Sequence, residues 1–92
     1  MAIVKQKILI VEDDIDVAEM VTAYFRAQGY DVLTVNWGED GVRSCQVNHP
    51  DLAILDIRLP DIDGYEVARR LRSDRRTADV PIIFLTEKRE RA

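Results

Sequence analysis

Two short apolar runs, each ending in carboxylates, constrain this chain more than any other feature. Run 8–11 leads into Glu12 and Asp13, and run 52–55 leads into Asp56. Short continuous apolar runs are typical of strands buried on both faces of a parallel sheet. Open α/β sheets place their binding crevice at the carboxyl ends of the strands, so we expect these acids to lie together there.

Clustered carboxylates repel one another, and the cluster therefore favours a bound cation. Mg²⁺ fits best, because this hard ion takes oxygen ligands from one or two carboxylates and completes its shell with water and phosphate oxygens. The pattern predicts an acidic Mg²⁺ pocket in which one carboxylate is positioned to meet a phosphoryl group.

Size and charge narrow the class of protein. The 92 residues, 47% of them apolar, predict one small globular domain, and the net charge of −4 argues against direct nucleic-acid binding through overall charge. The single cysteine, Cys45, excludes an intrachain disulfide and is expected to be buried. No run approaches the roughly 20 apolar residues of a membrane span, and the N-terminus does not read as a signal peptide, so we expect a cytoplasmic protein without membrane association.

Strand and helix patterns alternate along the chain. We expect strands at 7–11, 31–35, 51–55 and 80–85, and helices at 14–28, at 38–47 and from 63 onward. This alternation predicts an α/β fold with a parallel sheet and right-handed crossovers. On the third helix we expect an inner face and an outer face, the inner one formed by Tyr65, Val67, Ala68 and Leu71, the outer one by Arg69, Arg70 and Arg72.

Three segments together resemble the receiver domain of bacterial two-component response regulators. They are ILIVEDD at 8–14, LAILDIRLPDIDG at 52–64 and PIIFLTEK at 81–88. The resemblance implies a flavodoxin-like, doubly wound parallel sheet with strand order 2-1-3-4. It also implies a single receiver-like domain over 1–92 that is C-terminally truncated, because the chain ends before the usual fifth strand and fifth helix.

The resemblance assigns roles to particular residues. Asp56 is implied as the phosphoacceptor and Thr86 as the hydroxyl that reorients toward the phosphoryl oxygen and switches the conformation. Arg58 and Lys88 fall at positions that tune hydrolysis of the aspartyl phosphate in this family. The lysine that ends the usual fifth strand has no counterpart here, and Lys88 does not take its place, because it lies just after the fourth strand.

The resemblance also implies a ligand set for Mg²⁺. Asp13 and Asp56 are implied as direct ligands, Glu12 as an acid that holds metal-bound water, and Arg58 as a ligand through its backbone carbonyl. The implied partner is a sensor histidine kinase or a phosphotransfer protein. The implied activity is that of a phosphoacceptor switch rather than an enzyme, with at most self-catalysed phosphotransfer and autodephosphorylation.

The same residues bear on two alternative functions, a phosphatase and a pseudo-receiver. A dehalogenase-type phosphatase needs a second acid two residues after its nucleophile, and Arg58 occupies that position, which excludes it. A pseudo-receiver that works as an interaction or dimerisation module without efficient phosphotransfer stays open. Purely structural roles also stay open: Asp56 as a solvated loop acid and Thr86 as a helix cap.

Self-association is the remaining expectation. Segment 81–85 is strongly apolar, and in a sheet of order 2-1-3-4 it forms an edge strand, a common site of pairing with another chain. We therefore expect either a homo-oligomer formed through this side or a chain that is poorly stable alone.

Overall fold

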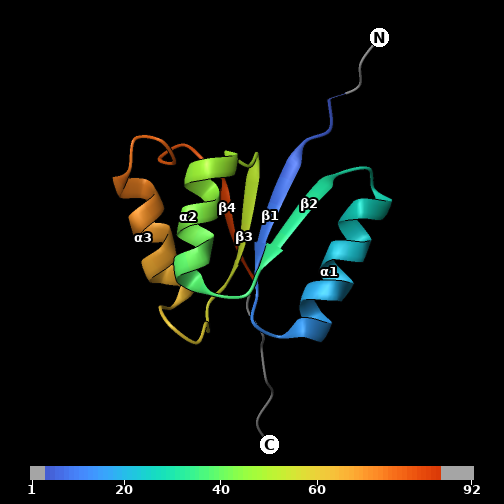
Figure 1. Ribbon diagram of the computed structural model, residues 1–92, viewed down its shortest axis with the longest axis horizontal. Helices are drawn as coiled ribbons and strands as arrows, with labels where there is room; N and C mark the ends of the chain where they lie inside the picture. The colour runs from blue at the N-terminus through green and yellow to red at the C-terminus, as the bar shows by residue number, and fades with distance from the viewer. Residues whose placement is uncertain (1–3, 86–92) are drawn as a thin grey trace, which may run out of the picture.

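The computed structural model describes residues 4–85 and shows three layers, a parallel sheet between helices on both faces (Figure 1). The strands run in the order β2-β1-β3-β4, and every neighbouring pair is parallel, as predicted. Along the chain the elements are β1 (Lys7–Val11), α1 (Ile15–Ala27), β2 (Asp31–Val35), α2 (Gly38–Asn48), β3 (Leu52–Asp56), α3 (Gly64–Ser73) and β4 (Ile82–Leu85).

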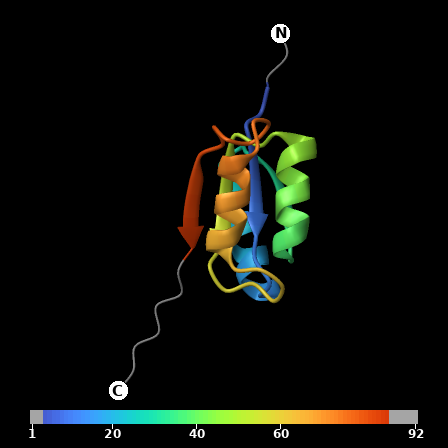
Figure 2. The same cartoon turned by 90° about the vertical axis from the view of Figure 1, so that its left-hand side faces the viewer.

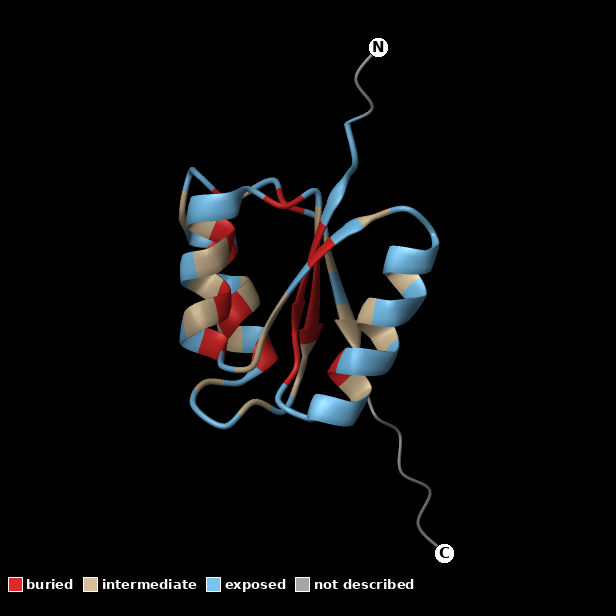
Figure 3. Cartoon of the chain, turned by 45° about the vertical axis from the view of Figure 1, so that its right-hand side comes forward, coloured by how far each residue is buried: buried red, intermediate tan, exposed pale blue. Residues whose placement is uncertain are grey.

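The two central strands are buried on both faces, which gives the domain two cores. The helices α2 and α3 lie side by side on one face of the sheet, the face turned to the viewer in Figure 2, and α1 lies on the other face (Figure 1). Burial follows this division, with the central strands almost entirely covered (Figure 3). The α2–α3 side buries Leu9, Val11, Cys45, Ala53, Leu55, Val67, Leu71 and Val80, and the α1 side buries Ile8, Ile10, Val32 and Ile54. The prediction that Cys45 is buried is confirmed.

Local signals set the helix boundaries close to where the sequence predicts them. Asp14 caps α1, because its carboxylate accepts hydrogen bonds from the amides of Asp16 (2.9 Å) and Val17 (3.2 Å). Gly29, with φ of 95°, takes the left-handed conformation that ends this helix. Asp63 caps α3 by accepting from the amide of Glu66 at 2.8 Å.

Two side chains of α3 depart from the predicted faces. Tyr65, expected to face inward, is 57% exposed, because only one side of its ring packs, against Phe84 at 5.0 Å between ring centroids. Arg70, expected to face outward, is half-buried between the helices. Its guanidinium lies 3.0 Å from the carboxylate of Glu39 on α2, a partner that helical spacing on α3 alone does not reveal.

Close packing of α2 on β1 depends on a missing side chain. A Cβ on Gly41 would lie 2.8 Å from Cγ2 of Val11 and 3.2 Å from its Cγ1, in a fully buried region. Because valine is branched at Cβ, it has little rotamer freedom to move away. The glycine therefore sets how near α2 comes to the sheet.

We predict that Gly41→Ala destabilises the protein. Alanine favours the helix by up to ~1 kcal/mol, but overpacking against Val11 costs ~1–3 kcal/mol, so a net loss is expected in the free energy of unfolding measured in urea. Combining Gly41→Ala with Val11→Ala removes the overlap, and the double variant should lose less than the sum of the two single variants. Additive losses would contradict the overlap.

Candidate functional site

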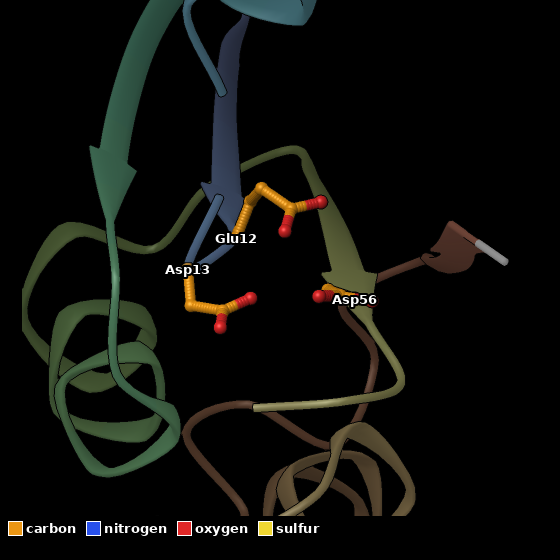
Figure 4. Close-up of side chains that lie close together, drawn as sticks. All are labelled: Glu12, Asp13 and Asp56. Carbon is orange, nitrogen blue, oxygen red and sulfur yellow. The ribbon is translucent and has the colours of Figure 1, made fainter. Parts of the chain in front are cut away.

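Strand register brings the carboxylates together. Val11 of β1 pairs with Leu55 of β3, so the chain leaves both strands at the same level of the sheet. The side chains of Glu12, Asp13 and Asp56 converge there (Figure 4), and each offers a carboxylate oxygen within 4.8 Å of the others. The predicted convergence of these acids at the carboxyl ends of two neighbouring strands is what the structure shows.

The three acids differ in burial and in support. Glu12 is only 4% exposed, whereas Asp56 is half-buried and Asp13 exposed. Two hydrogen bonds hold the backbone of Glu12. Its N–H donates to the carbonyl of Val35 (3.0 Å), and its carbonyl accepts from the side-chain amide, Nδ2, of Asn36 (2.9 Å). Glu12 is therefore the buried and fixed member of the acidic cluster, and Asp13 and Asp56 are the members that solvent reaches.

Burial and crowding raise the pKa of two of the three acids. Burial raises the pKa of Glu12 from 4.5 to about 7, with a further rise from Asp56 and opposition from the hydrogen bond donated by the Asp14 amide. Burial likewise raises the pKa of Asp56, and nearby Asp13 adds to the rise, whereas hydrogen bonds from Glu12 and from the Arg58 amide act in the opposite direction. Negative charge in this pocket is thus only partly compensated by the protein itself.

The donor set fits a hard divalent cation. All three groups present carboxylate oxygens, they are close enough to share one ion, and the exposure of Asp13 leaves room for retained water. Arg58, predicted as a backbone ligand, lies just beyond β3, and its amide donates to Oδ1 of Asp56 at 3.3 Å. Thr86 and Lys88 lie outside the residues that the structure describes.

A glycine closes the loop that follows Asp56. The amide of Gly64 donates to the carbonyl of Ile57 at 2.8 Å, which joins the two ends of the loop. A Cβ at Gly64 would collide with the backbone of Asp56 and Ile57. Glycine at this position therefore lets α3 begin directly beside the acidic pocket.

Two residues around the pocket were not predicted from the sequence. Asn36 holds the backbone of Glu12, and Asp61 accepts hydrogen bonds from the amides of Gly38 and Glu39, both at 2.8 Å. The sequence signals only that the start of α2 needs a cap from elsewhere, because Trp37, just before the helix, has no side-chain acceptor.

The parallel sheet of order β2-β1-β3-β4, with helices on both faces, places the chain in the flavodoxin-like class of α/β proteins. The response regulator receiver domain matches residues 8–92, and the chain belongs to this family. The probable transcriptional regulator ycf27 of Cyanophora paradoxa is 40% identical over 94% of this chain, and the DNA-binding response regulator MtrA of Mycobacterium tuberculosis (strain H37Rv) is 39% identical over 91%. The chain spans a little over a third of the length of these relatives, 35% and 36% respectively.

Solved structures agree with this assignment. The receiver domain of the sensor histidine kinase PA1611 from Pseudomonas aeruginosa superimposes with a TM-score of 0.87 at 38% identity, over 90% of this chain and 68% of that one. That structure holds a magnesium ion in its active site cleft. The chemotaxis response regulator CheY4 of Vibrio cholerae gives a TM-score of 0.88 at 28% identity, over 95% and 72% of the two chains.

The raised pKa of Glu12 predicts an unusual pH dependence for the metal-free protein. Between pH 4.5, the ordinary pKa, and about 7, the folded state holds a proton that the unfolded chain has released. Stability should therefore fall as the pH rises through this window and level off above it. Urea unfolding in the presence of a chelator, repeated from pH 4.5 to 8, measures the slope.

Glu12→Gln should flatten that slope, because the amide does not titrate. Glu19→Gln makes the same chemical change at an exposed position of α1 and serves as the control. An unchanged slope in Glu12→Gln would contradict the assignment of the proton to this pocket.

Proposed function

We propose that this chain is the phosphoacceptor module of a two-component system and that Asp56 receives the phosphoryl group. The observation that carries the proposal is the convergence of Glu12, Asp13 and Asp56 at one edge of the sheet, in a chain that belongs to the receiver family. Asp56 is the one of the three that ends a central strand and is also reachable from solvent. The phosphodonor is the phosphohistidine of a sensor histidine kinase or of a phosphotransfer protein.

The chemistry is a displacement at phosphorus. A carboxylate oxygen of Asp56 forms a bond to phosphorus, the bond from phosphorus to the histidine nitrogen breaks, and the leaving imidazole keeps the electron pair and takes up a proton. The Arg58 amide holds Oδ1 of Asp56, which leaves the second oxygen free to form the new bond. The product is an acyl phosphate on the protein.

Mg²⁺ is the cofactor that this donor set suits. Asp13, Asp56 and the backbone carbonyl of Arg58 would hold it, and Glu12 would hold metal-bound water. When bound, it neutralises charge on the phosphoryl oxygens that would otherwise be repelled by the pocket. The residues of the chain prepare the site: Glu12 releases its proton to solvent, and the loop after β3 orients Asp56. The ion in the PA1611 receiver domain supports this proposal by similarity.

Three further residues have roles that rest on family resemblance. Thr86 is proposed as the switch hydroxyl, and Arg58 and Lys88 are proposed to tune the lifetime of the phosphate.

Among residues 4–85, no helix combines the length and the apolar character needed to cross a bilayer. A cytoplasmic site of action is part of the proposal, because soluble phosphodonor domains of sensor kinases face that compartment.

Acetyl phosphate with Mg²⁺, followed by intact mass measurement, tests the proposal. We expect a gain of one phosphoryl group on the wild-type chain and none on Asp56→Asn, because an amide is a far weaker nucleophile than a carboxylate. Asp51→Asn makes the same change at the opposite end of β3 and should still be labelled. Arg58→Ala should be labelled as well, with an altered phosphate lifetime.

Two other outcomes of this experiment would contradict the proposal. Undiminished labelling of Asp56→Asn would move the acceptor to another residue. A wild-type chain that stays unlabelled while it binds Mg²⁺ would favour the alternative, a pseudo-receiver that serves as an interaction module.

Self-association through the β4 side is a separate prediction. Ile83 of β4 is 53% exposed, and Tyr24 of α1, the helix that covers the same face of the sheet, is 60% exposed. Burying ~400 Å² of apolar surface is worth about 10 kcal/mol before the costs of association. Sedimentation equilibrium over a wide concentration range should show a dimer, weakened by Ile83→Lys. A monomer at all concentrations would refute it.

A further inference from the structure

The N-terminus of α2 is capped by a residue from another loop. The preceding residue, Trp37, makes no capping hydrogen bond, so the first amides of the helix need another acceptor. Asp61, in the loop between β3 and α3, supplies both oxygens: Oδ1 accepts from the amide of Gly38 and Oδ2 from that of Glu39, each at 2.8 Å. These hydrogen bonds lower the pKa of Asp61, which keeps the cap charged.

The helix is also shaped to receive this loop. Gly38 is buried, and a Cβ there would lie 2.5 Å from Cγ1 of Ile62 and 2.9 Å from its carbonyl oxygen. Any larger residue would push the loop away from the helix. The missing side chain on α2 and the carboxylate on the loop thus serve the same contact.

The contact between Asp61 and the start of α2 joins two backbone segments that are each hydrogen-bonded to one of the clustered acids. On one side, Asn36 lies two residues before the start of α2, and its side-chain amide donates to the carbonyl of Glu12 at 2.9 Å. On the other side, the loop of Asp61 begins at Asp56, whose carboxylate accepts from the amide of Arg58. Arg58 therefore lies on a short arc of backbone held at one end by β3 and at the other by the α2 N-terminus.

We infer that Asp61 is a positioning residue for the acidic pocket: by capping α2 it fixes loop 57–63, and with it the backbone of Arg58 beside Asp56. The inference rests on the proposed function, since it concerns the same metal and phosphoryl site. Removing the cap deletes none of the three carboxylates but loosens the arc that holds Arg58 beside Asp56. Partners of this outer kind typically alter metal affinity 10–100-fold.

The experiment compares variants of the whole 92-residue chain by amide NMR, first metal-free and then titrated with Mg²⁺. Asp61→Ala removes both acceptors, Asp61→Asn keeps one, and Gly38→Ala disturbs the contact from the opposite side. The matched control is Asp63→Ala, which removes a cap from the same loop, but the cap of α3, made to Glu66 at 2.8 Å.

We expect Asp61→Ala to raise the Mg²⁺ dissociation constant about tenfold, followed through the amides of Asp13 and Asp56. Asp61→Asn should show a smaller rise, Gly38→Ala a rise in the same direction, and the Asp63→Ala control a change within about twofold, since losing a cap chiefly costs stability. An unchanged dissociation constant in Asp61→Ala, or an equal rise in the control, would overturn the inference.

The metal-free spectra separate this inference from the proposed function. Loss of the cap should shift the amides of Ile57 and Arg58 as well as those of Gly38 and Glu39. If the wild-type chain binds no Mg²⁺ at Asp13 and Asp56, the proposed site fails, and the metal-free spectra alone decide the role of Asp61. Shifts at Ile57 and Arg58 then support positioning, and shifts confined to the α2 amides overturn it.

Discussion

The parallel pairing of β1 with β3 forces like charges together, and the rest of the site depends on this. The register sets Val11 beside Leu55, so Glu12 and Asp56 leave the sheet at the same level. Slipping the pair by one residue would turn buried side chains such as Leu9 and Leu55 toward the wrong face. Hydrophobic burial thus fixes the register, and it stabilises the domain enough to tolerate carboxylates that repel one another.

The loops around the pocket then keep the repulsion from dispersing the acids. Asn36 holds the backbone of Glu12, and the Arg58 amide holds the carboxylate of Asp56. Both segments meet at the start of α2, where Asp61 caps the helix. These are hydrogen bonds to backbone groups, which restrict position without neutralising the negative charge.

How far the sequence predicts this structure depends on how local each feature is. The alternation of strands and helices, the helix starts near Asp14 and Asp63 and the meeting of Glu12 with Asp56 follow from short patterns combined with the rules of parallel sheets. The strand order was predicted from the family resemblance. The prediction that Arg70 faces outward was wrong because its partner, Glu39, lies 31 residues away in the sequence, on another helix. Asp61 was missed for the same reason, since its role exists only once two loops have been brought together by the sheet.

A cluster of three carboxylates favours both protons and cations, because each of them relieves the same repulsion. A proton on Glu12, whose pKa is about 7, removes one negative charge, and a divalent cation removes more. The two compete, so a cation that binds near neutral pH must displace the proton from Glu12, and by linkage a fall in pH must weaken the cation. Under the proposed function, a phosphoryl group on Asp56 would add negative charge and so strengthen the need for the cation. The unfavourable charge that the strand register imposes would then couple proton, metal and phosphoryl group at one site.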